Sequence, residues 1–186
     1  MHNISAVILA AGSGTRIGIP KLKLKHRGEY YVNLIISKLK YAGIEDVVCV
    51  IRKDEEEWFK QNALSVQYLI NDNPETGMIH SVLLGINHFE GLEGVIVFPV
   101  DHPFVKTETI TKLKNEFEEN NESIVKPLYD GVSGHPIIIP KRLFGFINSS
   151  DNLNLVIQKS GLRVLEVIVK DEGILKNINY AEDLGK

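Results

Sequence analysis

Residues 4–21 of the chain read ISAVILAAGSGTRIGIPK. The first half is an almost unbroken apolar run, which predicts a β-strand buried on both faces, as in a parallel sheet. The second half is a polar loop rich in glycine, a residue that lets backbone N–H groups turn toward an anion. Arg16 and Lys21 add two positive charges to this loop, and such a pair suits a polyphosphate. The stretch therefore predicts an α/β fold with an anion-binding loop.

Two known phosphate-binding motifs fit this loop poorly. A Walker A loop needs a Gly-Lys-Ser/Thr sequence, but the residue directly after Gly18 is Ile19. A dinucleotide fingerprint needs G-x-G-x-x-G, but Ile17 stands at the third glycine position, and the next predicted strand is followed by Arg52 rather than by an acid for a ribose hydroxyl. A merely flexible loop is the third interpretation, and it does not explain Arg16 and Lys21.

The rest of the chain alternates strands with helices of about a dozen residues, which is typical of βαβ units on a parallel sheet. We expect strands at residues 46–51, 66–70, 94–99 and 123–126, and helices at 30–42, 78–89 and 107–120. A short polar helix with a solvated acidic start is expected from Asp54. After Tyr129 the pattern changes to a Gly-rich loop, an apolar run at 136–139, a helix pair near Leu143 and Leu153, and extended segments at 163–169 and 173–178. The last third is therefore predicted to be more mixed.

Composition narrows the function classes. The 186 residues suggest one domain, 1–186, and 24% charged residues are ordinary for a globular protein. A single cysteine excludes an internal disulfide and a Cys-based metal site, and it fits a reducing compartment. The net charge of −3 gives no indication of a nucleic-acid or membrane-surface protein. Without a leader-like or membrane-spanning apolar run, the expected location is cytoplasmic.

Positive charge is concentrated at the start of the chain. Residues 1–28 contain Arg16, Lys21, Lys23, Lys25 and Arg27 and no acid, so this segment carries +5 and the remaining residues carry −8. The alternation of lysine and leucine from Lys21 to Lys25 predicts solvent-facing strand positions for some of these lysines. The distribution points to one small anionic ligand at one end of the sheet.

Five segments resemble, in order, the motifs of the MobA-like NTP transferase family, especially the molybdenum-cofactor cytidylyltransferases. They are residues 9–21 (the Gly-rich signature), 73–82 (the base-binding segment), 99–104 (D-x-P), 134–137 (G-H-P) and 173–184 (the terminal segment). The resemblance implies a Rossmann-like (GT-A-type) three-layer α/β nucleotidyltransferase fold with a mostly parallel sheet and a mixed C-terminal part. It also implies an Mg²⁺-dependent EC 2.7.7-type transferase that moves a nucleoside monophosphate from CTP or GTP to a molybdopterin-type phosphate, and a molybdoenzyme or chaperone partner.

The resemblance also implies roles for matched residues. Arg16 and Lys21 would hold the triphosphate and stabilise the departing pyrophosphate. Asp101, which directly follows a predicted buried strand, would be the principal Mg²⁺ ligand, with Asn179 as the second. Asn179 could equally cap the final helix, as Ser81 could open another. The expected nucleotide-binding residues are Leu9, Ala10, Ala11, Gly12, Gly14, Arg16, Lys21, Gly77 and Ser81.

Several alternatives stay open. The form Asn177-Ile178-Asn179 resembles guanylyl enzymes, whereas Ala10-Ala11 resembles cytidylyl enzymes. His102 and His135 lie in matched motifs and are candidates for contact with the acceptor, but their tasks are undetermined. The acceptor could instead be a sugar, polyol or other small phosphate. A non-catalytic nucleotide-binding module is the interpretation from a different class.

Overall fold

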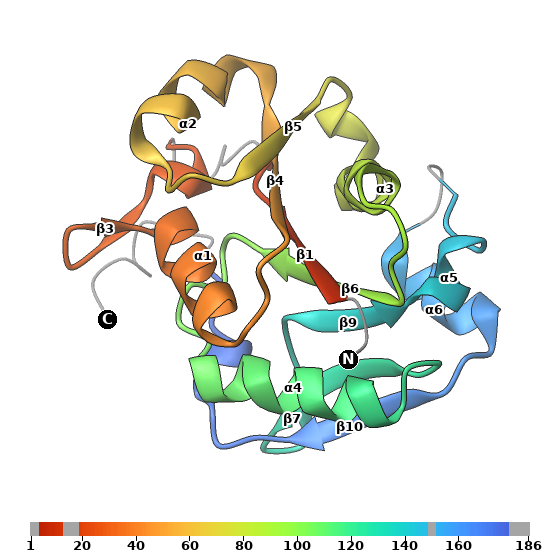
Figure 1. Cartoon of the computed structure of the whole chain (residues 1–186). Helices are drawn as coiled ribbons and strands as arrows, with labels where there is room; N and C mark the ends of the chain where they lie inside the picture. Colours follow the sequence, from red (N-terminus) through yellow and green to blue (C-terminus); the bar gives the residue numbers. More distant parts are fainter. Residues whose placement is uncertain (1–3, 13–18, 149–151, 179–186) are drawn as a thin grey trace.

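A mixed sheet forms the centre of the molecule (Figure 1). The computed structural model describes residues 4–12, 19–148 and 152–178. Within these residues the sheet contains β1 (Ile4–Leu9), β4 (Val47–Arg52), β5 (Gln67–Asn71), β6 (Gly94–Pro99), β7 (Ile124–Tyr129), β8 (Val132–Ser133), β9 (Ile137–Pro140) and β10 (Val164–Ile168). The strand order is β10-β7-β9-β6-β1-β4-β5, and β8 pairs with β7. A separate hairpin consists of β2 (Lys25–His26) and β3 (Glu29–Tyr30).

The two halves of the sheet differ in strand direction. In the first half, β1 pairs in parallel with both β4 and β6, and β4 pairs in parallel with β5. In the second half, β9 is antiparallel to both β6 and β7, while β10 is parallel to β7. The predicted mostly parallel sheet with a mixed C-terminal part is therefore confirmed.

Helices cover both faces of the sheet, which gives three layers (Figure 1). One face carries α1 (Tyr31–Tyr41), α2 (Glu56–Asn62) and α4 (Thr107–Glu119), and the other carries α3 (Met78–His88), α5 (Lys141–Phe144) and α6 (Leu153–Ser160). At the end of α1, Gly43 has the positive φ of 76° that favours glycine as a C-terminal cap. None of the helices in the described ranges has the length and hydrophobicity needed to cross a bilayer.

Strand β1 is buried on both faces, as its apolar run predicts. Ala6 and Ile8 pack with the α1 and α4 side, while Val7 and Leu9 pack with the α3 side. Burying an aliphatic side chain of this size contributes about 1.5–3 kcal/mol, and a one-residue slip would exchange the two faces. The core thus fixes the register of β1 and the point at which its polar loop begins.

Two expected extended segments have another conformation. Residues 21–23 form a 3-10 helix rather than a strand, although Leu22 and Leu24 are buried as the alternation indicated. The predicted extended segment at 173–178 begins instead with a 3-10 helix, Glu172–Ile174, because the Asp171 carboxylate accepts the Gly173 N–H (3.0 Å) and caps a turn.

Candidate active site

The carboxyl ends of β1, β4 and β6 lie side by side. Leu9 in β1 is paired with Val50 on one side and with Pro99 on the other. Two hydrogen bonds continue this pairing: the Ala10 N–H donates to the Val50 carbonyl (2.9 Å), and the Val100 N–H donates to the Leu9 carbonyl (3.1 Å). The segments that follow β1 and β6 therefore start from one edge of the sheet, where open α/β sheets bind ligands.

The predicted nucleotide loop starts at this edge. Residues 9–11 are buried, and Gly12 is exposed. Because the sheet uses the Ala10 N–H, backbone donors for a ligand have to come from the residues after it. Gly14 and Arg16, which were predicted to bind the triphosphate, lie outside the described residues.

Lys21 and Asp101 meet at the same edge. The Lys21 Nζ lies 2.6 Å from the Asp101 Oδ2, and the two side chains are 17% and 18% exposed. Burial alone would raise the pKa of Asp101. The hydrogen bonds and charges of His102 and Lys21 have a larger, opposite effect, so the pKa falls to about 2. The carboxylate is therefore ionised at neutral pH. The structure brings together the predicted phosphate-binding cation and the predicted metal ligand, which are 80 residues apart in the chain.

A second partner holds the other oxygen of this carboxylate. His102 Nδ1 lies 2.8 Å from the Asp101 Oδ1, and an ionised carboxylate can only accept, so Nδ1 carries the proton. The His102 ring packs edge-on against the His135 ring, with 4.8 Å between centroids. Burial, and then the charge of His102, lower the pKa of His135 to about 4, so this second ring is uncharged at neutral pH.

The G-H-P segment is tied to the last described part of the chain. The His135 N–H donates to the Ile174 carbonyl (3.0 Å), and the His135–Pro136 peptide is cis. A Cβ on Gly134 would lie 2.3 Å from the Ile174 oxygen, so only glycine fits at this approach. Further along, the Ile178 N–H donates to the Asp101 carbonyl (2.9 Å). Residues 174–178 thus connect the two histidine-bearing turns, and Asn179 lies outside the described residues.

The predicted base-binding segment connects β5 to α3. Gly77 has a φ of 83°, which favours glycine, and it directly precedes α3. Ser81 is buried, and its hydroxyl accepts a hydrogen bond from the Asn71 Nδ2 (2.9 Å), while the Asn71 Oδ1 accepts the Asn73 N–H (2.9 Å). The buried Ser81 side chain therefore supports the loop through Asn71, whereas Gly77 is an exposed residue of that loop.

The motifs did not single out two further residues at this edge. Arg52 ends β4 and is paired in register with Asn71, which ends β5. The Arg52 guanidinium is 28% exposed and donates from Nε to the Asp54 Oδ1 (3.0 Å). The sequence pattern that indicates Arg52 and Asn71 is a polar residue directly after a predicted parallel strand, because such residues lie at the ligand-binding edge of the sheet.

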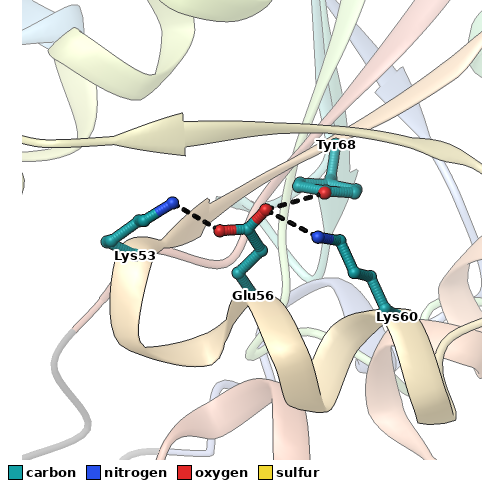
Figure 2. Close-up of polar contacts among 4 residues, drawn as sticks. All are labelled: Lys53, Glu56, Lys60 and Tyr68. Carbon is teal, nitrogen blue, oxygen red and sulfur yellow. Dashed lines mark hydrogen bonds and ion pairs between the residues drawn. The ribbon is translucent and has the colours of Figure 1, made fainter.

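The acidic run after β4 has a structural role in the described structure. Figure 2 shows that Glu56 accepts hydrogen bonds from Lys53 (2.5 Å), Lys60 (2.9 Å) and the Tyr68 hydroxyl (3.0 Å). These contacts join α2 to β5. The expectation of a solvated acidic start is wrong at Glu55, which is 1% exposed and whose Oε2 accepts the backbone N–H of Arg52 (3.2 Å).

Asp101 is chemically suited to Mg²⁺. This cation takes oxygen ligands and is usually held by one or two protein groups, with phosphates and water completing its coordination. Across residues 4–12, 19–148 and 152–178, no three His, Cys, Asp or Glu side chains form a group that could hold an ion. Among the described residues, Asp101 would therefore be the single acidic ligand of such a cation. Since the Lys21 ammonium contacts Oδ2, it has to leave that oxygen before a cation can bind there.

Comparisons with known proteins identify relatives of this chain. The chain is 33% identical over 144 residues to the bifunctional protein GlmU of Clostridium perfringens strain SM101, covering 74% of this chain and 31% of that protein. The chain therefore spans less than a third of the length of the curated relatives it matches.

Solved structures share the fold. Rv0371c of Mycobacterium tuberculosis H37Rv superposes with a TM-score of 0.81 at 19% identity, covering 98% of this chain and 95% of that one. The 4-diphosphocytidyl-2C-methyl-D-erythritol synthase of Anaerococcus prevotii gives 0.78 at 18% identity, with 98% and 95% covered. Molybdopterin-guanine dinucleotide biosynthesis protein A of Archaeoglobus fulgidus gives 0.72 at 20% identity, with 97% and 94% covered. Rv0371c has also been solved in complex with manganese, and that structure gives 0.72 at 15% identity, with 90% and 88% covered.

The family model of the MobA-like NTP transferase domain matches residues 6–172, from β1 to the turn after β10. Proteins of this family are nucleotidyltransferases, enzymes of EC 2.7.7 type that use a divalent metal, an NTP and a phosphate-bearing acceptor. The resemblance inferred from the five motifs is thereby confirmed. The chain belongs to the MobA-like NTP transferase family.

Proposed function

We propose that this chain is an Mg²⁺-dependent nucleotidyltransferase that transfers a nucleoside monophosphate from CTP or GTP to a molybdopterin-type phosphate. In the reaction, an oxygen of the acceptor phosphate bonds to the α-phosphorus of the NTP. The bond from that phosphorus to the bridging oxygen breaks, and pyrophosphate leaves with the electron pair. The observation that carries the proposal is the Lys21–Asp101 contact of 2.6 Å, placed where the Gly-rich loop leaves β1.

Catalysis of this kind needs positioning and charge compensation rather than a side-chain nucleophile. Lys21 and Arg16 would bind the triphosphate and stabilise the negative charge that develops on pyrophosphate. Asp101 would hold Mg²⁺, which supplies charge neutralisation at the phosphates when it is bound. The hydrogen bond from Ile178 to the Asp101 carbonyl supports Asn179, the next residue, as a second ligand. Residues 9–12 with Gly14, and Gly77 with Ser81, would bind the nucleotide.

The identity of the base rests on two opposing signals. Ala10-Ala11 favours CTP, whereas Asn177-Ile178-Asn179 favours GTP. The structural neighbours include both a diphosphocytidyl synthase and a molybdopterin-guanine dinucleotide protein, so the fold agrees with either. CTP is the leading assignment and GTP the alternative.

A second acceptor class is favoured by a specific observation. The neighbour from Anaerococcus prevotii is named as a synthase of a diphosphocytidyl methylerythritol. A polyol, sugar or other small phosphate is therefore the alternative acceptor for the same chemistry. A non-catalytic nucleotide-binding module remains the alternative of a different class, and it predicts binding without turnover.

The same proposal covers the organisation and setting of the protein. Residues 1–186 would form one nucleotidyltransferase domain, supported by the family match over residues 6–172. A cytoplasmic location is supported by the single cysteine, Cys49, which is free and buried in β4. A molybdoenzyme or its chaperone would be the protein partner that takes up the product.

The test is pyrophosphate release in Mg²⁺ from CTP, GTP, ATP and UTP, each with molybdopterin, sugar-phosphate and polyol-phosphate acceptors. The proposal expects release with CTP or GTP only when molybdopterin is present. Asp101→Asn removes a negative charge from the metal site, so it should abolish metal-dependent turnover, while Asp46→Asn on the loop before β4 serves as a matched control. Release with a polyol or sugar phosphate instead would establish the alternative acceptor, and nucleotide binding without release from any pair would contradict the enzyme.

A further inference from the structure

We propose that His102 is a positioning residue for Asp101: its Nδ1–H fixes Oδ1, so that Oδ2 becomes the oxygen that a divalent cation takes from Lys21. The inference rests on the proposed function and goes further, because it gives a task to a histidine that lies in a matched motif but has no role assigned by it. It starts from the observation that each oxygen of the Asp101 carboxylate has its own partner, His102 at 2.8 Å and Lys21 at 2.6 Å.

The two partners differ in how firmly they are held. The His102 side chain is 8% exposed, and its backbone lies in a tight turn in which the His102 N–H donates to the Pro99 carbonyl (3.2 Å). Its imidazole has only two rotatable bonds. The Lys21 side chain is 17% exposed and reaches Asp101 through a flexible four-carbon stem. His102 is therefore the lasting partner of Asp101, and Lys21 is the exchangeable one.

The His135 ring packs against the His102 ring and supports it. It packs edge-on at 4.8 Å, with an interplanar angle of 61°. The backbone of His135 is itself held, because its N–H donates to the Ile174 carbonyl (3.0 Å) and the preceding Gly134 packs so close to that carbonyl that a Cβ would lie 2.3 Å from its oxygen. A rotation of the His102 ring away from Asp101 would have to displace this second ring. The pair of rings thus limits Asp101 to one orientation.

One fixed oxygen matters because the other must change partner. When Lys21 turns to a triphosphate, an unsupported carboxylate would be free to rotate about its last bond. A hydrogen bond on Oδ1 removes that freedom and leaves Oδ2 in place. Outer partners of this kind typically contribute about 10- to 100-fold to metal affinity.

The test compares two substitutions of His102. His102→Asn keeps an N–H donor near the position of Nδ1, whereas His102→Leu keeps apolar volume and removes the donor. Mn²⁺ binding is measured by electron paramagnetic resonance in the presence of CTP or GTP, and the Mg²⁺ dependence of pyrophosphate release and the KM for the NTP are measured beside it.

We expect His102→Leu to weaken Mn²⁺ binding and to raise the half-saturating Mg²⁺ concentration by about 10- to 100-fold. The KM for the NTP at saturating metal should stay within about threefold, because His102 does not itself bind the nucleotide. His102→Asn should recover most of the metal affinity. A leucine variant with wild-type metal affinity, or an asparagine variant as defective as leucine, would overturn the proposal.

His135→Phe supplies the matched control. It keeps an aromatic edge against His102 while removing both ring nitrogens, so metal affinity should be retained, whereas His135→Ala should lower it. A phenylalanine variant as defective as alanine would contradict the supporting role of the ring. Thermal unfolding checks that each variant folds, and His102→Phe repeats the test if His102→Leu does not.

The outcome for His102 can be separated from the outcome for the proposed function. If the wild-type protein binds Mn²⁺ with nucleotide but releases no pyrophosphate, the enzymatic assignment fails. The dependence of Mn²⁺ binding on His102 can still be measured in that case. If turnover is normal and metal affinity does not respond to His102, the positioning role alone fails.

Discussion

Gly134→Ala tests how the fold supports the site. The new Cβ would lie 2.3 Å from the Ile174 oxygen and 2.8 Å from its carbonyl carbon. Ordinary van der Waals contact begins at 3.4 Å, so the carbonyl would have to retreat by about 1 Å. Retreat is difficult because Ile174 is fully buried and the same oxygen accepts the His135 N–H (3.0 Å).

The expected cost follows from these two contacts. Overpacking of a dense site costs about 1–3 kcal/mol, and weakening the hydrogen bond adds about 1 kcal/mol. The free energy of unfolding should therefore fall by about 2–4 kcal/mol, which for a chain of this size lowers Tm by about 4–16 °C. Activity should fall as well, since Ile174 lies on the segment whose Ile178 bonds to Asp101.

The assay is thermal and urea unfolding followed by far-ultraviolet circular dichroism. Gly145→Ala is the matched control, because nothing lies within 4 Å of its Cβ position and its φ of −66° is open to any residue. The control should be neutral or gain about 0.4–1 kcal/mol through the unfolded state. If the free energies of unfolding of the two variants lie within about 0.5 kcal/mol of each other, the close approach at Gly134 does not constrain the fold.

Three other substitutions or treatments give separate tests. Lys21→Ala should weaken NTP binding by about 10- to 100-fold, because it removes a charge-assisted contact, and it should weaken nucleoside binding much less. Lys23→Ala is the control. Equal losses of affinity for NTP and for nucleoside would contradict the role of Lys21. Burial raises the pKa of Glu55 to about 7, above its value of about 4.3 in the unfolded chain, so the folded state favours the protonated form. The stabilising contribution of Glu55 is then fully present below the pKa of the unfolded chain, and it is lost as the pH rises through about 7. In urea titrations between about pH 5 and pH 8, the free energy of unfolding of the wild type should fall by up to about 3 kcal/mol relative to that of Glu55→Gln. Parallel pH profiles of the two proteins would rule this out. Burial also raises the pKa of the Cys49 thiol well above its usual range, so Ellman's reagent should detect no thiol in the native protein and the single cysteine after denaturation, whereas rapid labelling of the native state would show that β4 is not buried as described.

The parallel half of the sheet was predictable because its central strands, β1, β4 and β6, are buried on both faces. The predicted strand at residues 94–99 coincides with β6, Gly94–Pro99, since a run of Val, Ile and Phe can only be buried there. The contact between Lys21 and Asp101 was predictable in outline. The carboxyl ends of parallel strands meet at one edge, and the segments that contain these two residues both begin there.

Other features depend on contacts that no local pattern reveals. Glu55 belongs to an acidic run that would be solvated in an isolated helix, but the fold buries it: its Oε2 accepts the backbone N–H of Arg52, while its Oε1 has no hydrogen-bond partner among the described residues. The turn at Glu172–Ile174 forms because Asp171 also accepts from the Lys106 N–H (2.8 Å) and the Thr109 hydroxyl (2.7 Å), which come from the start of α4. In both cases a distant part of the chain decides the local structure.

The three lysines at residues 21–25 show how the structure divides a charged segment. Lys23 Nζ lies 5.6 Å from the Trp58 ring centroid, and Lys25 Nζ lies 4.2 Å from the Tyr30 ring centroid. Each such contact contributes about 0.5–1 kcal/mol at an exposed site, so these two charges stabilise the hairpin region. Lys21 alone of the three reaches Asp101. The positive charge at the start of the chain is therefore divided among different contacts: Lys23 and Lys25 lie over aromatic rings, whereas Lys21 pairs with the ionised Asp101 at the carboxyl edge of the sheet.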